Sequence, residues 1–132
     1  MKDGVVAVLV RGDRVLFIRR AEAVPYGGYW CPLSGKVEPG ESQAHAVVRE
    51  VREEVGLRVR AVRKVWECPT EGADYLLHWW LVEEDGGELV LEPREVADAG
   101  WFTRDEVHAL TPTFDVDRVF VDTILPGLKD GG

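Results

Sequence analysis

The sequence has few cysteines and no long apolar run, and each shortage excludes a class of protein. Its only two cysteines, Cys31 and Cys68, form no CxxC or zinc-binding pattern, so we expect buried or incidental free thiols. The longest early apolar run, residues 5–10, is too short for a signal-peptide core or a bilayer span. We therefore expect a cytoplasmic protein without a membrane partner.

Positive charge is also scarce. The 16 Lys and Arg against 24 Asp and Glu give a net charge of −8, which disfavours nucleic-acid polymers and anionic membrane surfaces as partners. A small phosphorylated ligand fits, because a metal ion bridges an acidic protein and an anionic substrate. The oligomeric state stays open between monomer and homodimer.

Known catalytic patterns for other chemistries are absent too. The sequence contains no P-loop, no GxGxxG and no Ser-His-Asp order, which leaves acid–base chemistry with a metal.

What is present fits one globular domain over residues 1–128, with a frayed tail at 129–132. Apolar and β-branched runs predict one hairpin from residues 5–10 and 15–19, and long strands at 57–67 and 75–83. A second hairpin signal at Asp85-Gly86-Gly87 predicts that residues 88–91 pair back. These elements indicate an α/β fold with a mixed sheet.

Two helices are expected near the end of the sequence. Thr103 to Glu106 has the form of a capping box, which opens a short helix to Leu110. Helical spacing predicts a further helix over residues 115–125, which Pro126 ends.

The sequence is organised around residues 35–57, where a Gly/Pro loop leads into one amphipathic helix. Ser42 is the expected N-cap and Gly56 the expected left-handed stop. At about 100° per residue, a core-facing stripe comprises Ala44, Val47, Val48, Val51 and Val55. A second arc carries Glu50, Glu53 and Glu54.

Three carboxylates along one side of a helix repel one another. Like charges at i, i+4 cost about 0.2–0.5 kcal/mol per exposed pair, and a bound divalent cation reverses that sign. Hard oxygen ligands suit Mg²⁺ or Mn²⁺, which take one or two carboxylates and keep positions for water and phosphate oxygens. The alternative is a solvated acidic face that arginines partly neutralise.

The spacing resembles the Nudix box, G-x5-E-x7-R-E-U-x-E-E-x-G-U with U aliphatic. Every fixed position is matched, by Gly35, Glu41, Arg49, Glu50, Val51, Glu53, Glu54, Gly56 and Leu57. The resemblance implies an α/β/α sandwich around a mixed β-sheet. It also implies Mg²⁺-dependent hydrolysis of the pyrophosphate linkage in a nucleoside diphosphate joined to another group.

The resemblance assigns roles within the box. Glu50, Glu53 and Glu54 would ligate the metal, and Gly35 would offer its carbonyl. Glu41 would support the metal site from the loop. Arg49 would orient the carboxylates through charge-assisted hydrogen bonds. One glutamate, with Glu53 the first candidate, would take a proton from the attacking water.

Outside the box, Glu95 is the candidate that approaches the metal from another direction. It lies in an acidic loop that Pro93 stiffens and Val96 anchors, and Glu95-x5-Trp101 resembles an E-x5-W segment of the same family. We expect Glu95 to face Glu53 and Glu54 as a ligand or base. The alternative is a solvated loop acid.

Three residues are candidates for binding the substrate. In the family, an arginine at the position of Arg20 often contacts the nucleotide; otherwise this residue is a solvated strand end. Trp30, beside a glycine loop, either stacks on the base or packs. Tyr75 lies where the resemblance associates a tyrosine with dinucleoside polyphosphates, but it also begins a strand.

The short chain favours a (d)NTP or a dinucleoside polyphosphate as the small-molecule substrate. The alternatives are a nucleotide sugar or ADP-ribose. A nucleotide-binding module without turnover is the competing class, although such a module has no need of a complete set of glutamates.

Overall fold

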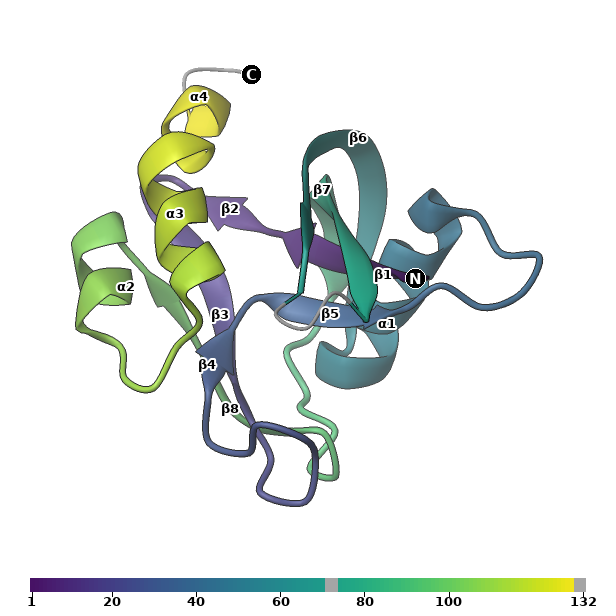
Figure 1. Ribbon diagram of the computed structural model, residues 1–132, viewed down its shortest axis with the longest axis horizontal. Helices are drawn as coiled ribbons and strands as arrows, with labels where there is room; N and C mark the ends of the chain where they lie inside the picture. The colour runs from purple at the N-terminus through teal and green to yellow at the C-terminus, as the bar shows by residue number, and fades with distance from the viewer. Residues whose placement is uncertain (71–73, 130–132) are drawn as a thin grey trace. The chain divides into compact units, whose positions relative to one another are not determined.

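The computed structural model describes residues 1–70 and 74–129. Two compact units are formed, Met1–Leu9 with Leu33–Val90 and Val10–Pro32 with Leu91–Gly132. Each unit has its own sheet, as Figure 1 shows. The single domain expected over residues 1–128 stays a prediction.

A four-stranded sheet forms the first unit. In the order β5-β1-β7-β6, its strands are Leu33–Lys36, Lys2–Val8, Tyr75–Gly87 and Leu57–Pro69. β1 pairs with β7 in parallel, whereas β1–β5 and β6–β7 are antiparallel. The predicted mixed sheet and both long strands are therefore confirmed.

The helix of the first unit, α1 (Gln43–Val55), begins and ends as predicted. Ser42 is the N-cap and accepts the His45 N–H at 3.1 Å. Gly56 has φ 76°, and its N–H bonds to the Arg52 carbonyl, which is the geometry that favours glycine at this position.

The buried face of α1 packs on β1, β5 and β6. Its fully buried residues are Ala46, Val47, Val51 and Val55, and each such valine contributes about 1.5–3 kcal/mol. The predicted stripe is wrong at Ala44 and Val48, which are only half-buried. The face that meets the sheet is rotated towards Ala46.

The first predicted hairpin is wrong in its first strand. Residues 5–10 are divided, because β1 ends at Val8 and a short β2 (Val10–Arg11) belongs to the second unit. It is β2 that pairs with β3 (Arg14–Arg20), with Val10 opposite Val15. A run that is apolar at every position has no alternation to mark such a break.

The second predicted hairpin is also wrong. β7 continues through Gly87, which lies opposite Leu57, and residues 88–91 form no strand. Both glycines have positive φ, and a Cβ at Gly87 would lie 2.6 Å from the Gly56 carbonyl oxygen. The glycine pair therefore permits a close backbone approach at the end of α1, not a turn back.

The second unit is built on β3. This strand pairs antiparallel with β2, with β4 (Trp30–Cys31) and with β8 (Val96–Phe102). Three helices follow β8: α2 (Arg104–Ala109), α3 (Asp115–Thr123) and α4 (Leu125–Lys129). The predicted capping box is confirmed, with reciprocal bonds of 3.2 and 2.8 Å between Thr103 and Glu106.

The helix predicted over residues 115–125 is divided into α3 and α4. Pro126 lies in the first turn of α4 instead of ending a helix. A proline is tolerated there because its missing N–H would have no partner in the helix. Lys129 ends α4, and residues 130–132 of the expected tail lie outside the described residues.

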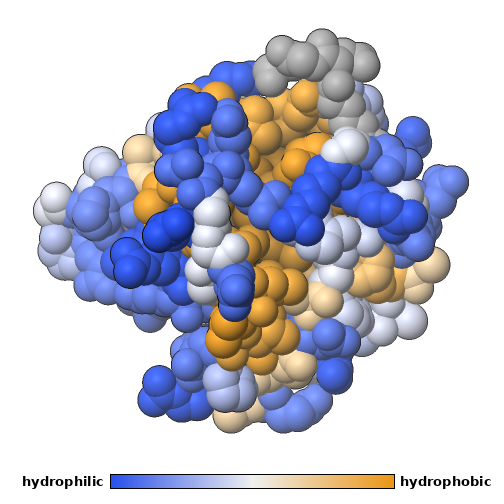
Figure 2. All heavy atoms as spheres, turned by 180° about the vertical axis from the view of Figure 1, so that it is seen from behind, coloured by the Kyte–Doolittle hydropathy of each residue, from blue (hydrophilic) through white to orange (hydrophobic). Residues whose placement is uncertain are grey.

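Across the described residues, no helix is both long and apolar enough to cross a bilayer. Figure 2 shows apolar side chains gathered on part of the face seen from behind, among mostly polar ones. Cys31 and Cys68 are both thiols, as expected.

Asp117, in the first turn of α3, is a buried acid with 3% exposure. Desolvation raises the pKa of its carboxyl to about 7, although hydrogen bonds with the Phe114 backbone and the Thr113 side chain, and the charge of Arg118, oppose this rise. The Thr113 hydroxyl, which also bonds Asp117, donates its one proton to the Trp30 carbonyl at 2.7 Å.

This raised pKa predicts how stability depends on pH. The folded chain keeps the Asp117 proton up to about pH 7, whereas the unfolded chain loses it near 3.8. Stability therefore falls as pH rises between these values. Asp117→Asn should remove this fall. Its free energy of unfolding should exceed that of the parent at pH 8 by up to about 4 kcal/mol and should differ little at pH 4.

Urea unfolding of both proteins from pH 4 to pH 8 measures the difference. Asp115→Asn is the matched control, because its side chain is 95% exposed at the start of the same helix. Parallel stability curves for the parent and Asp117→Asn would contradict a buried, protonated Asp117.

Candidate active site

The residues of the box come together at the junction of β5 and α1. β5 supplies Gly35, α1 supplies Arg49 and three glutamates, and the loop between them supplies Glu41. Gly40 makes the turn with φ 78°, and the Glu41 N–H donates to the Glu38 carbonyl at 3.0 Å. This turn points Glu41 back towards the helix that follows it.

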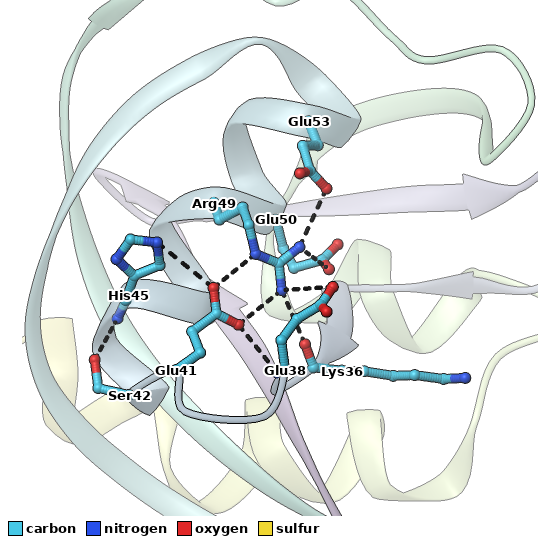
Figure 3. A network of polar contacts seen from close by, with 8 residues as sticks. All are labelled: Lys36, Glu38, Glu41, Ser42, His45, Arg49, Glu50 and Glu53. Carbon is cyan, nitrogen blue, oxygen red and sulfur yellow. Dashed lines mark hydrogen bonds and ion pairs between the residues drawn. The ribbon is translucent and has the colours of Figure 1, made fainter.

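Arg49 is the centre of the site, as Figure 3 shows. Its guanidinium donates to both carboxylate oxygens of Glu41, at 2.7 and 2.9 Å. It also donates to Glu50 at 2.9 Å and to Glu53 at 3.2 Å, and Glu38 lies within 3.9 Å. One arginine thus contacts carboxylates from both the loop and the helix.

The ion pair between Arg49 and Glu41 keeps both side chains charged. The Glu41 side chain is only 9% exposed, and its hydrogen bonds from Arg49 lower the pKa of the carboxyl from 4.5 to about 2. The same contact raises the pKa of Arg49. Since the folded pKa of Glu41 is lowered, its contribution to stability is present above about pH 4.5 and is lost towards pH 2.

Two contacts of Arg49 were not predicted. The Lys36 carbonyl accepts an Arg49 N–H at 3.0 Å, and Glu38 joins the ion-pair network. A main-chain acceptor carries no side-chain signal, so the sequence gives no means of finding the Lys36 contact. The acidic side chain of Glu38 beside the turn is a weak sign of a contact with Arg49, because the loop carries other charged residues.

Gly35 permits Glu50 to approach the strand. A Cβ at this position would lie 2.1 Å from the Glu50 carboxyl carbon, far inside van der Waals contact. The Glu50 carboxylate therefore occupies the space that any other residue at position 35 would fill. This contact brings an anionic side chain against the backbone of β5.

The oxygen donors suit the predicted Mg²⁺ or Mn²⁺ in type. Glu50 and Glu54 are half-buried on α1, and the Glu53 side chain is 58% exposed. Within residues 1–70 and 74–129, no three His, Cys, Asp or Glu side chains converge on one metal position. Mg²⁺ needs only one or two protein carboxylates, because water and phosphate fill its other positions.

Arg20 and Trp30 lie in the second unit. Arg20 ends β3, and its Nε donates to the Pro25 carbonyl at 2.6 Å. Trp30 packs edge-on against Phe102 at a centroid distance of 5.4 Å. Its carbonyl accepts the Thr113 hydroxyl. The predicted contacts of Arg20 and Trp30 with the substrate stay predictions.

Glu95 also lies in the second unit, in the turn before β8. Its carbonyl accepts the Ala21 N–H at 3.0 Å, and the next residue, Val96, is buried. Its predicted approach to Glu53 and Glu54 stays a prediction. Tyr75 begins β7 in the first unit, with the Lys2 ammonium 6.0 Å above its ring.

A family model described as NUDIX domain matches residues 1–124. The chain belongs to the Nudix family, so the predicted family and fold are confirmed, and the predicted enzyme class is that of the family's hydrolases. Members of this family generally use divalent metals such as Mg²⁺.

Curated relatives are similar over most of this chain. An NAD-capped RNA hydrolase NudC of Stutzerimonas stutzeri is 33% identical over 129 residues, which is 95% of this chain and 45% of that protein. The NudC of Deinococcus radiodurans is 40% identical over 100 residues, 76% of this chain and 36% of that protein. The chain thus spans less than half of each of these relatives.

A solved structure shares the fold. The crystal structure of a MutT NUDIX hydrolase from Burkholderia pseudomallei has a TM-score of 0.79 and 28% sequence identity. The match covers 92% of this chain and 95% of that one.

The close approach of Gly35 and Glu50 generates a prediction. Gly35→Ala should displace the Glu50 carboxylate, which lies at the end of a flexible side chain, and should leave the fold intact. We expect at least about tenfold weaker Mn²⁺ binding by calorimetry, equivalent to about 1.4 kcal/mol, with a small change in Tm. Gly127→Ala is the control, because its added Cβ meets nothing within 4 Å. Unchanged Mn²⁺ affinity in Gly35→Ala would contradict a metal-binding role for Glu50 in this position.

Proposed function

We propose that the chain hydrolyses the pyrophosphate linkage of a nucleoside diphosphate joined to another group, with Mg²⁺ or Mn²⁺ as cofactor. The observation that carries the proposal is the carboxylate face of α1, where Arg49 holds Glu50 and Glu53 beside Gly35. An anionic diphosphate meets repulsion from such a face unless a cation lies between them.

Glu50, Glu53 and Glu54 would hold the metal, together with the Gly35 carbonyl. A bound Mg²⁺ neutralises diphosphate charge and lowers the pKa of its water. Both oxygens of Glu41 bind Arg49, which favours a supporting role for Glu41 over direct ligation. Arg49 would then keep the orientation of Glu50 and Glu53.

Two glutamates are candidates for the proton acceptor. Arg49 donates hydrogen bonds to three glutamates, and Glu53 has the most exposed side chain of the three, at 58%. Water therefore reaches the Glu53 carboxylate. Glu95 is held by its backbone between Ala21 and the buried Val96. Its neighbour Glu92 instead binds Arg94 at 2.6 Å, which favours Glu95 for catalysis.

We propose a (d)NTP or a dinucleoside polyphosphate as the first substrate class, with Arg20, Trp30 and Tyr75 as candidates for binding it. Nucleotide sugars and ADP-ribose are alternatives, as is a binding module without turnover. The relatives named for NAD-capped RNA add NAD, whose two nucleosides share a pyrophosphate. A net charge of −8 still favours small substrates over a polymer. A cytoplasmic monomer or homodimer stays our prediction.

Incubation with (d)NTPs, diadenosine polyphosphates, ADP-ribose, NAD and nucleotide sugars, with product identification, tests the activity. Turnover should require Mg²⁺ or Mn²⁺ and stop on chelation.

Glu53→Gln should lower kcat by at least about 10² without unfolding. Glu83→Gln is the control, since Glu83 on β7 is similarly exposed and pairs with Arg60 of β6. Turnover that survives exhaustive chelation would refute the metal requirement. A near-normal rate for Glu53→Gln would refute a catalytic role for Glu53.

The role of Glu95 needs a separate comparison within one loop. Glu95→Gln should lower kcat by about 10²–10⁴, whereas Glu92→Gln should retain most of the rate. Rate measurements on both variants at saturating metal decide this. Equal effects of the two substitutions would make Glu95 an ordinary loop acid.

A further inference from the structure

Trp80 is a half-buried residue of β7 that contacts the first turn of α1. Its indole N–H donates to the side-chain oxygen of Gln43, the first residue of the helix, at 3.1 Å. Because an indole nitrogen only donates, the Gln43 amide presents its oxygen to this contact. The bond joins the start of α1 to a strand that lies between β1 and β6 in the sheet.

Apolar burial begins one turn into α1. The first fully buried residue of the helix is Ala46, whereas Gln43 and Ala44 are half-buried and His45 is exposed. Hydrophobic packing therefore stabilises the body of the helix more than its first turn. The hydrogen bond at Gln43 acts at the end of the helix where burial contributes least.

The residues around this first turn include a partner of Arg49. Glu41 lies two residues before Gln43, and both of its carboxylate oxygens accept Arg49 N–H groups. The same guanidinium donates to Glu50 and Glu53 further along α1. A displacement of the first turn would move Glu41 relative to Arg49, and the guanidinium would lose the geometry that it shares with the other two glutamates.

We infer that Trp80 and Gln43 are positioning residues for the candidate site, because their hydrogen bond fixes the first turn of α1 and thereby the contact of Glu41 with Arg49. Trp80 lies outside residues 35–57, and Gln43 stands at a position where the Nudix box fixes no residue. The inference rests on the proposed function, since the orientation of these carboxylates affects hydrolysis only if they serve it.

The Arg49 Nε–H proton of the metal-free protein, observed by NMR, reports the bond to Glu41 directly. It should exchange with solvent at least about threefold faster in Trp80→Phe and in Gln43→Met, which each remove one partner of the Trp80–Gln43 bond and keep a large side chain. The double variant should exchange no faster than either single variant, because all three lose the same bond. Gln43→Glu, which keeps an acceptor oxygen, should match the parent.

Metal binding and turnover give a second measurement. Both single variants should weaken Mn²⁺ binding by about 3- to 10-fold in calorimetry. At saturating metal they should lower kcat by about 3- to 10-fold and leave KM within about twofold, because the reacting groups are misplaced and no contact with substrate is removed.

Trp66→Phe is the matched control, because Trp66 is a half-buried indole of β6 that packs on Trp79 at a centroid distance of 5.1 Å. The inference is overturned if Trp80→Phe and Gln43→Met lower Tm but leave Arg49 exchange unchanged, since their bond would then be ordinary packing. It is also overturned if their effects add in the double variant, or if Trp66→Phe speeds exchange equally. Exchange is measured without metal or substrate, so a parent without turnover would refute the proposed function and leave the positioning role to the exchange result.

Discussion

The interaction on which the site depends is the set of charge-assisted bonds from Arg49 to Glu41, Glu50 and Glu53. Carboxylates at this spacing repel one another, and a single guanidinium with donors on several sides holds them without neutralising them. The position of the Arg49 side chain depends on the elements around it. The Ser42 cap fixes where α1 begins, and the Lys36 carbonyl binds the guanidinium from β5. Helix, loop and strand are thereby joined at one side chain.

The parts of this fold that could be predicted are those with local causes. The ends of α1 follow from Ser42 and Gly56, and the capping box at Thr103 follows from hydrogen bonds three residues apart. The division of residues 5–10 has no local cause, since it depends on β7 pairing with β1 and β3 pairing with β2. The turn predicted at Gly87 is wrong for the same reason, because the Gly56 carbonyl that leaves no room for a Cβ at Gly87 belongs to another element.

The candidate site also has features with local causes and features that depend on how the elements pack. Side-chain identity and spacing predict that Glu50, Glu53 and Arg49 lie together, because all three belong to one helix. The space that Gly35 leaves for Glu50 depends on how β5 packs beside α1. The Lys36 carbonyl that binds Arg49 is a main-chain acceptor, and only the packing of β5 beside α1 brings the two groups to 3.0 Å.

Arg49 and a divalent cation are not alternatives for this site, because the charges exceed what one guanidinium supplies. Arg49 carries one positive charge and contacts three carboxylates, those of Glu41, Glu50 and Glu53. Glu41 keeps its charge at neutral pH, since the pKa of its carboxyl is lowered to about 2. The carboxylates that share Arg49 therefore stay charged at neutral pH, and the proposed Mg²⁺ or Mn²⁺ would reduce the repulsion between them. Arg49 sets the geometry of Glu41, Glu50 and Glu53, and the proposed cation would neutralise negative charge that these carboxylates carry.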